Sequence, residues 1–244
     1  GMLKRQRHHF ILEKLQEEGA VQVSSLAETL NVDPVTIRRD LSQLDEEGRL
    51  RRVHGGAVVR EAQALPDLPS DLTRRIAETA AEFIPDESVV FLGPGTLTAE
   101  VVPFFQPRSH LTIITNALNA AWSAARQHQH TLHVIGGQVG ESHGIYGDPD
   151  RLRRIRADRI ILEADGLDAE RGLTHDDRDY ATMTRALFSL SAQIIVLIPP
   201  ERLGRVGALF IAPAGEVDML ITGREADNAP LWDLSELGIR VVLT

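Results

Sequence analysis

The sequence lacks cysteine, which excludes disulfides, thiolate metal sites and cysteine nucleophiles. Lysine is nearly absent as well, because Lys4 and Lys14 are the only two among 26 Lys and Arg residues. No lysine follows residue 14, so Schiff-base chemistry is excluded from the rest of the chain. No run approaches the roughly 18 consecutive apolar residues of a membrane span, and the first residues lead into no signal-peptide apolar region. We therefore expect a cytoplasmic protein.

Charge is distributed unevenly along the 244 residues, whose formal net charge is −9. Residues 1–60 hold ten Lys and Arg against nine Asp and Glu, whereas the remainder holds 16 against 26. The acidic excess belongs to the second part, and a near-neutral first part with clustered arginines can bind DNA. The length and a hydrophobic content of 43% allow two folded domains.

Residues 33–44, DPVTIRRDLSQL, have the pattern of a helix that reads DNA. Asp33 can cap this helix and Pro34 suits its first turn. An apolar stripe forms at positions i, i+4 and i+7, namely Ile37, Leu41 and Leu44. An arginine opposite that stripe can read guanine through two hydrogen bonds in the major groove. Asp40 lies beside the stripe, so we expect it to form an ion pair within the domain instead of contacting DNA.

The neighbouring segments complete a winged helix-turn-helix domain over residues 2–60. A first helix over residues 3–18 ends at Gly19, and Ser24 or Ser25 can cap a second helix. After the third helix, two strands flank Gly55-Gly56, a two-residue hairpin signal. The alternative is a small helical bundle for protein contacts. The candidate DNA-binding residues are Ser24, Ser25, Val35, Thr36, Arg38, Arg39, Ser42 and Gln43, with Arg51, Arg52 and His54 on the wing.

A proline-containing linker over residues 61–70 precedes a second domain, residues 71–244, in which helical and strand-like runs alternate. Continuous apolar strands are expected at residues 89–92, 111–115, 131–135, 159–164, 193–198, 219–222 and 240–243. Such strands alternating with helices indicate a mostly parallel α/β sheet covered on both faces. Asn116 is expected to cap the helix after the second strand.

Polar and glycine residues follow five of these strands, at the sheet edge where ligands bind in open α/β folds. They are Gly95-Thr96, Thr115-Asn116, Gly136-Gly137, residues 165–168 and residues 202–204. A Gly-Thr turn that opens a helix offers backbone N–H groups and a hydroxyl to an anion. Each turn alone can be a simple connection between a strand and a helix, but five such turns at one edge favour a ligand crevice.

The first domain resembles the DeoR family of bacterial transcriptional regulators. The motifs that carry this resemblance are TIRRDL at residues 36–41 and HGGA at residues 54–57, which stand intact. The resemblance implies a DNA-binding regulator, a repressor in most such proteins, and not an enzyme. It also implies double-stranded operator DNA as a partner. Twofold-symmetric DNA sites favour at least a dimer, so we expect a homo-oligomer, a dimer or larger.

The second domain resembles the effector domain of the same family, which is similar in fold to ribose-5-phosphate isomerase and senses phosphorylated sugars. Two motifs depart from the family pattern. The Gly-Thr-Thr phosphate loop reads GPGTLT at residues 93–98, and the Asp-x-Ser-Lys motif reads PPER at residues 199–202, so that Arg202 replaces the lysine. The expected effector-binding residues are Gly95, Thr96, Thr98, Thr115, Asn116, Gly136, Gly137, Asp168 and Arg202, with no metal and no cofactor.

Two alternatives remain open for this domain. A sugar-phosphate isomerase with a DNA-binding domain could use Asp165, Asp168, Asp176 or Asp177 as the proton-transferring carboxylate, but the family lysine is missing. A regulator that has lost effector sensing could retain the domain for oligomerisation, as the altered phosphate loop suggests. The cluster His175-Asp176-Asp177 lacks a second histidine at helical spacing, so it is expected to be a solvated loop and not a metal site.

Overall fold

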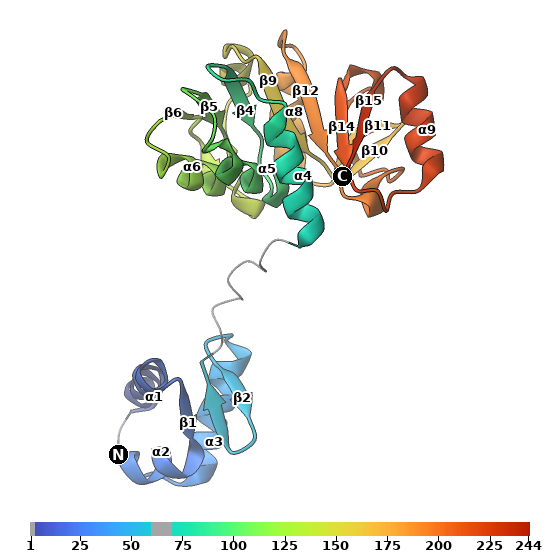
Figure 1. Ribbon diagram of the computed structural model, residues 1–244. Helices are drawn as coiled ribbons and strands as arrows, with labels where there is room; N and C mark the ends of the chain where they lie inside the picture. The colour runs from blue at the N-terminus through green and yellow to red at the C-terminus, as the bar shows by residue number, and fades with distance from the viewer. Residues whose placement is uncertain (1–2, 60–69) are drawn as a thin grey trace. The chain divides into compact units, whose positions relative to one another are not determined.

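The computed structural model describes residues 3–59 and 70–244, which form two compact units (Figure 1). We refer to residues 3–59 as the N-terminal unit and to residues 70–244 as the C-terminal unit. The expected linker lies outside the described residues except for Ser70, whose hydroxyl accepts the N–H of Thr73 and caps the first helix of the C-terminal unit. Within the described ranges, no helix is long and apolar enough to cross a membrane.

Three helices build the N-terminal unit: α1 (Lys4–Glu18), α2 (Val23–Leu30) and α3 (Pro34–Glu46). Gly19 ends α1 in the left-handed conformation, with φ of 75°, as its position predicted. The three stripe residues of α3 are fully buried together with Ile11 of α1 and Leu26 of α2. The core therefore fixes which face of α3 is left exposed.

A three-stranded antiparallel sheet completes this unit, and it corrects two expectations. Its strands lie in the order β1 (Ala20–Gln22), β3 (Gly56–Val58), β2 (Arg51–Val53). The hairpin turn is His54-Gly55 and not Gly55-Gly56, because Gly56 pairs with Val53 and a Cβ there would lie 2.0 Å from the Val21 carbonyl oxygen. Neither serine caps α2, because the helix already begins at Val23, directly after β1.

Among residues 70–244, the main sheet of the C-terminal unit has seven parallel strands. Their order is β15 (Arg240–Leu243), β14 (Met219–Thr222), β12 (Gln193–Leu197), β9 (Arg159–Glu163), β4 (Val89–Leu92), β5 (Thr112–Thr115) and β6 (Thr131–Val134). All seven lie at the positions that the apolar runs predicted. From β4 the chain adds β5 and β6 on one side of the sheet, and from β9 it adds β12, β14 and β15 on the other side. The strand order therefore reverses between β4 and β9, which makes this pair the switch point of the sheet.

Helices cover both faces of this sheet, as expected for strands that are apolar throughout. One face packs against α4 (Asp71–Glu82), α5 (Thr96–Val101) and α6 (Leu118–Ala125). The other packs against α7 (Asp150–Arg153), α8 (Arg178–Leu187) and α9 (Asn228–Glu236). Asn116 does not cap α6; instead the Thr115 hydroxyl accepts the N–H of Ala117, and the Asn116 amide donates to the Ile145 carbonyl.

Short strands that were not predicted surround the carboxyl edge of the main sheet. An antiparallel sheet contains β10 (Gly166–Asp168), β11 (Gly172–His175) and β13 (Leu209–Ala212), and a second pair contains β7 (Gln138–Val139) and β8 (Ile145–Tyr146). Residues 166–168 are thus a strand instead of part of a simple turn. These short strands place segments that are distant in the sequence near the β4–β9 switch point.

Candidate DNA-binding surface and ligand cavity

The exposed side of α3 has the geometry that the sequence predicted. Asp33 caps the helix, since its Oδ1 accepts the N–H of Val35 at 2.7 Å. Arg38 and Arg39 are exposed, and Val35 is 49% exposed, which is unusual for a valine in a small domain. A shallow hollow of about 620 Å³ lies along this side, lined by Val35, Arg38, Arg39, Ser42, Gln43, Glu46 and Glu47. We call the first five of these residues, with Thr36, the recognition face.

Asp40 forms the predicted ion pair inside the N-terminal unit. Its carboxylate accepts hydrogen bonds from the Arg7 guanidinium, and His8 Nε2 lies 3.1 Å from Asp40 Oδ1. Burial alone would raise the pKa of Asp40, but the hydrogen bonds with Arg7 and His8 outweigh it and hold this pKa below its ordinary value. The carboxylate therefore joins α1 to α3 and is directed away from the recognition face.

The wing residues lie beside the recognition face. Arg51, Arg52 and His54 are exposed. Arg52 donates a hydrogen bond of 2.8 Å from Nη1 to the Ser42 hydroxyl, so the wing is attached directly to α3. Ser24 and Ser25 are exposed in the first turn of α2. All eleven predicted DNA-binding residues thus lie in one small unit, most of them on the recognition face and the wing.

A cavity of about 160 Å³ opens at the carboxyl ends of β4 and β9, where the sheet changes direction. Three of the nine predicted effector residues line it, namely Gly95, Thr96 and Arg202. The other lining residues come from several segments: Pro94, Glu141, Ser142, Tyr146, Glu163, Asp165, His175, Asp177 and Tyr180. The cavity therefore lies where ligands bind in open α/β sheets.

Glu163 lines the cavity, and the sequence analysis did not include it among the effector-binding residues. It is the last residue of β9, and its Oε2 accepts the N–H of Thr98 at 3.0 Å, in the first turn of α5. A Cβ added to Gly95 would lie 1.9 Å from this carboxyl group, so the side chain fills the space above the loop. Burial raises the pKa of Glu163 to about 7, although the Thr98 hydrogen bond opposes the shift. A lone acidic residue directly after the apolar run at residues 160–162 was the available signal.

Arg202 is also engaged within the protein. Its Nη1 lies 3.4 Å from Asp165 Oδ1, and Asp165 Oδ2 lies 3.3 Å from His175 Nδ1. His175 stacks on Tyr180 with ring centroids 3.8 Å apart, and burial lowers its pKa. The expectation of a solvated loop is therefore wrong for His175, which ends β11 and is half-buried against the cavity.

The remaining predicted effector residues lie outside the cavity lining. The hydroxyls of Thr98 and Thr115 donate to the backbone carbonyls of Gly93 and Leu92, both at 2.7 Å. Asp168 accepts the N–H groups of Glu170 and Arg171 in the β10–β11 turn. Gly136 and Gly137 follow β6, and a Cβ on Gly137 would meet the Tyr146 carbonyl oxygen at 2.3 Å. In this structure these residues hold loops in place around the cavity.

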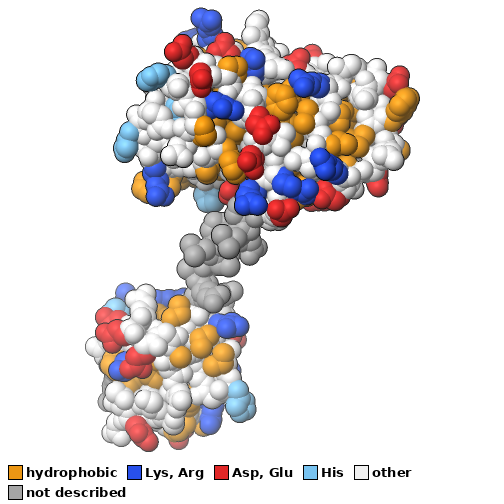
Figure 2. Space-filling model, viewed as in Figure 1, with side chains coloured by type: hydrophobic (Ala, Val, Ile, Leu, Met, Phe, Trp, Pro, Cys, Tyr) orange, Lys and Arg blue, Asp and Glu red, His pale blue; other side chains and the backbone are white. Residues whose placement is uncertain are grey.

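Charge on the C-terminal unit is mixed rather than segregated. On the face that Figure 2 shows, acidic and basic side chains lie next to one another. Arg75, for example, contacts both Asp71 at 3.2 Å and Glu225 at 2.7 Å. On this face, the acidic side chains therefore do not form one continuous block.

Comparison with known proteins agrees with both units. Residues 7–63 match the DeoR-like helix-turn-helix domain, and residues 70–224 match the DeoR C terminal sensor domain. The chain is 30% identical over 252 residues to the HTH-type transcriptional regulator UlaR of Escherichia coli K12, covering 99% of each chain. It is 28% identical to a protein named as an aga operon transcriptional repressor of Escherichia coli O157:H7, over 98% of this chain and 93% of the relative.

A solved structure of ribose 5-phosphate isomerase A from Methanocaldococcus jannaschii is similar over 54% of this chain and 53% of that chain, with 16% identity and a TM-score of 0.41. The winged helix-turn-helix domain and its exposed arginines define a DNA-binding transcriptional regulator with a separate sensor domain. The chain belongs to the DeoR family of regulators. Its relatives bear the names of regulators, in agreement with the expectation that it is not an enzyme.

Proposed function

We propose that the C-terminal unit binds a small phosphorylated, sugar-like metabolite that controls DNA binding, and that the chain acts as a repressor. The observation that carries this proposal is the cavity at the sheet switch point, where Gly95, Thr96 and Arg202 line one space. Backbone N–H groups and a guanidinium favour an anion. An effector regulates only if it binds the DNA-competent and DNA-incompetent arrangements unequally.

Each side chain has a role in this proposal. The phosphate would lie against Thr96 with Arg202 supplying charge, while Asp165 and Asp177 would accept hydrogen bonds from sugar hydroxyls. Glu163 would have to accept a proton or rotate away, since two anions cannot share one small cavity without a large electrostatic cost. The predicted effector-binding residues that do not line the cavity, such as Thr98 and Asp168, would hold the surrounding loops in place.

Calorimetry with a panel of sugar phosphates and their unphosphorylated parents tests this assignment. We expect binding that needs the phosphate and that weakens at least tenfold in Thr96→Ala/Arg202→Ala. Arg205→Ala is the matched control, because Arg205 does not line the cavity. A ligand that binds equally well without its phosphate, or equally well to the double variant, would move the effector out of this class.

A second candidate is a regulator without an effector, which Glu163 favours because it already fills the loop above Gly95. In that case no sugar phosphate would release heat or change the affinity for operator DNA. The C-terminal unit would then serve oligomerisation alone.

We also propose that the regulator works in the cytoplasm as a homo-oligomer of at least two chains. Operators of helix-turn-helix proteins are commonly two-fold symmetric, and a dimer matches that symmetry. Light scattering on the purified chain, with and without operator DNA, measures the number of copies. A monomer in both conditions would contradict the proposed assembly.

A further inference from the structure

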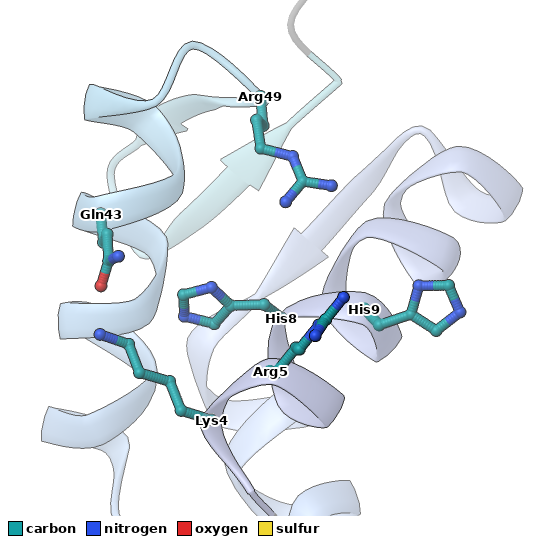
Figure 3. Close-up of a pocket in the computed structure, with 6 residues that line it drawn as sticks. All are labelled: Lys4, Arg5, His8, His9, Gln43 and Arg49. Atoms are coloured by element: carbon teal, nitrogen blue, oxygen red, sulfur yellow. The ribbon is translucent and has the colours of Figure 1, made fainter.

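A second hollow lies on the N-terminal unit, between α1 and the end of α3. It measures about 550 Å³, and we call it the α1–α3 cleft. Its lining residues are Lys4, Arg5, His8, His9, Gln43 and Arg49. Figure 3 shows Lys4 and His8 reaching from α1 toward α3, with the Arg49 guanidinium directed toward the same space. Every lining side chain is a cation, a histidine or an amide, and no carboxylate is among them.

The cations of the α1–α3 cleft are available to a partner. Lys4, Arg5 and Arg49 are exposed, and none of the three forms an ion pair with another described residue. Glu13 and Glu47 contact other lining residues of the cleft and not these three cations: Glu13 lies 3.2 Å from His9, and Glu47 accepts a hydrogen bond from the Gln43 amide at 2.8 Å. Lys4, Arg5 and Arg49 therefore carry positive charge that is not paired with any described carboxylate.

A buried contact holds the two walls of the cleft together. His8 lines the cleft, and its Nε2 lies 3.1 Å from Asp40 Oδ1, which also accepts a hydrogen bond from Arg7 Nη2. Because Asp40 belongs to α3 and His8 to α1, this contact fixes the spacing of the two helices. The cations are thus carried by a rigid part of the fold, and such preorganisation lowers the entropy cost of binding.

The α1–α3 cleft is continuous with the recognition face, because Gln43 lines both hollows. A helix in the major groove has phosphates on both of its sides, and DNA carries one negative charge for about every 1.7 Å of its axis. α3 packs against both β2, in the wing, and α1. We propose that the α1–α3 cleft binds DNA backbone phosphates through Lys4, Arg5 and Arg49, beside the recognition face.

Phosphate contacts carry no sequence information, so the test needs no operator. We would titrate the full chain against a fluorescein-labelled 30-base-pair duplex of mixed sequence, by anisotropy at several KCl concentrations. In Lys4→Ala/Arg5→Ala/Arg49→Ala, the slope of log affinity against log salt should fall by about two to three units, since each phosphate contact contributes about 0.9. The single variant Arg49→Gln should lose about one unit.

Lys14→Ala is the matched control, because the only other lysine of the chain is also on α1 but is paired with Glu18 at 2.7 Å. It removes the same charge and should leave the slope unchanged. An unchanged slope in both the triple variant and Arg49→Gln would overturn the proposal, as would an equal loss in Lys14→Ala. Arg49→Gln keeps the test valid if the triple variant fails to fold, since Arg49 is exposed and follows α3.

A further measurement separates DNA phosphates from a free anion. Inorganic phosphate and KCl, compared at equal ionic strength, should weaken DNA binding by the wild-type chain equally. Inorganic phosphate that binds the wild-type chain in calorimetry but not the triple variant, with the same salt slope of DNA binding in both chains, would assign the cleft to a free anion and overturn the proposal.

Discussion

The DNA-binding surface and the ligand cavity differ in how their charged groups are compensated. Arg38 and Arg39 are exposed on α3, and neither forms an ion pair with another described residue. Arg202, in the cavity, already lies 3.4 Å from Asp165, and Glu163 already accepts the N–H of Thr98. One surface presents charges that its own chain leaves unpaired, whereas the other presents charges that its own chain has paired.

The physical reason is the surrounding dielectric. An exposed guanidinium is solvated by water and needs no partner, whereas a charge in a small cavity costs several kcal/mol unless it is paired. The N-terminal unit can therefore meet DNA without rearrangement, while a phosphorylated ligand must exchange internal contacts for its own. The predictions below test this difference, beginning with the largest expected effect.

Asp40→Ala should have the largest effect, because it removes the carboxylate between α1 and α3. Arg7 and His8 would lose that partner in a place where the Asp40 side chain is only 4% exposed. Removal of one partner from a buried ion pair costs about 3–5 kcal/mol. We expect this loss of stability to appear as reduced hydrogen-exchange protection of α1 and α3. DNA binding should be lost as a consequence.

Asp40→Asn is the matched control and adds a pH test. A lowered pKa means that ionised Asp40 stabilises the fold above its unfolded pKa of about 4, and that this contribution disappears as pH falls through the folded value. The wild-type N-terminal unit should lose stability in acid by this route, and the Asn variant should lack this component. Equal acid sensitivity of the two chains would contradict the role given to Asp40.

Glu163→Gln should change the pH dependence of the C-terminal unit. The folded pKa is raised from 4.5 to about 7, so the ionised carboxyl lowers stability as pH rises through this interval. Relative to wild type, the Gln variant should gain roughly 2–3 kcal/mol between pH 4 and pH 8. Trp122 and Trp232 are 72% and 68% exposed and would report unfolding poorly, so urea unfolding of this unit is followed at each pH by pulsed hydrogen exchange of the buried strands β4 and β9.

The control for this measurement is Glu141→Gln, another carboxylate that lines the cavity but is exposed. It should leave the pH profile unchanged. A stability difference between Glu163→Gln and wild type that stays constant from pH 4 to pH 8 would show that Glu163 does not titrate in this range.

Arg39→Ala should weaken operator binding while leaving the fold intact, because Arg39 points away from the buried stripe of α3. Loss of one bidentate base contact costs about 1–3 kcal/mol. An operator selected from a random library, measured by anisotropy, provides the comparison, and a duplex with a changed base pair shows which position Arg39 reads. Unchanged affinity for the selected operator would remove Arg39 from the recognition face.

The wing arginines should have the smallest effects, and they should differ from each other. We expect Arg51 to contact a DNA phosphate, so Arg51→Ala should lower the salt slope by about one unit for any duplex. Arg52 also holds Ser42 on α3, so Arg52→Ala should in addition disturb sequence preference. If both variants altered sequence preference at a constant salt slope, the wing would be reading bases.

Much of the fold could be predicted because local signals and packing agree. The Asp33 cap and the left-handed Gly19 were predicted by residue type, and the seven core strands were predicted as apolar runs. The errors lie where tertiary contacts override local preference. Val23 begins α2 because β1 feeds directly into it, and Gly56 belongs to a strand because Val21 passes too close for a Cβ.

The cavity was harder to predict than the recognition face. Side chains on α3 follow from a period of 3.6 residues. The cavity instead collects residues from the loop after β4, the start of α5, residues 141–142, β8, β9, β11, α8 and the segment between β12 and β13. Glu163 and His175 reach it through strands whose pairing depends on sequence-distant partners. No periodicity within one segment could reveal that Glu163 would occupy the loop predicted to hold a phosphate.

The central claim is that the DNA-binding surface binds DNA without an effector. A ligand can enter the cavity only by replacing contacts that Arg202 and Glu163 already form within the chain. Anisotropy of the ligand-free chain with the selected operator tests it most directly, before and after addition of sugar phosphates. We predict tight, salt-dependent binding by the ligand-free chain, and weaker binding once an effector is present. Binding that arises only after a sugar phosphate is added would contradict the account.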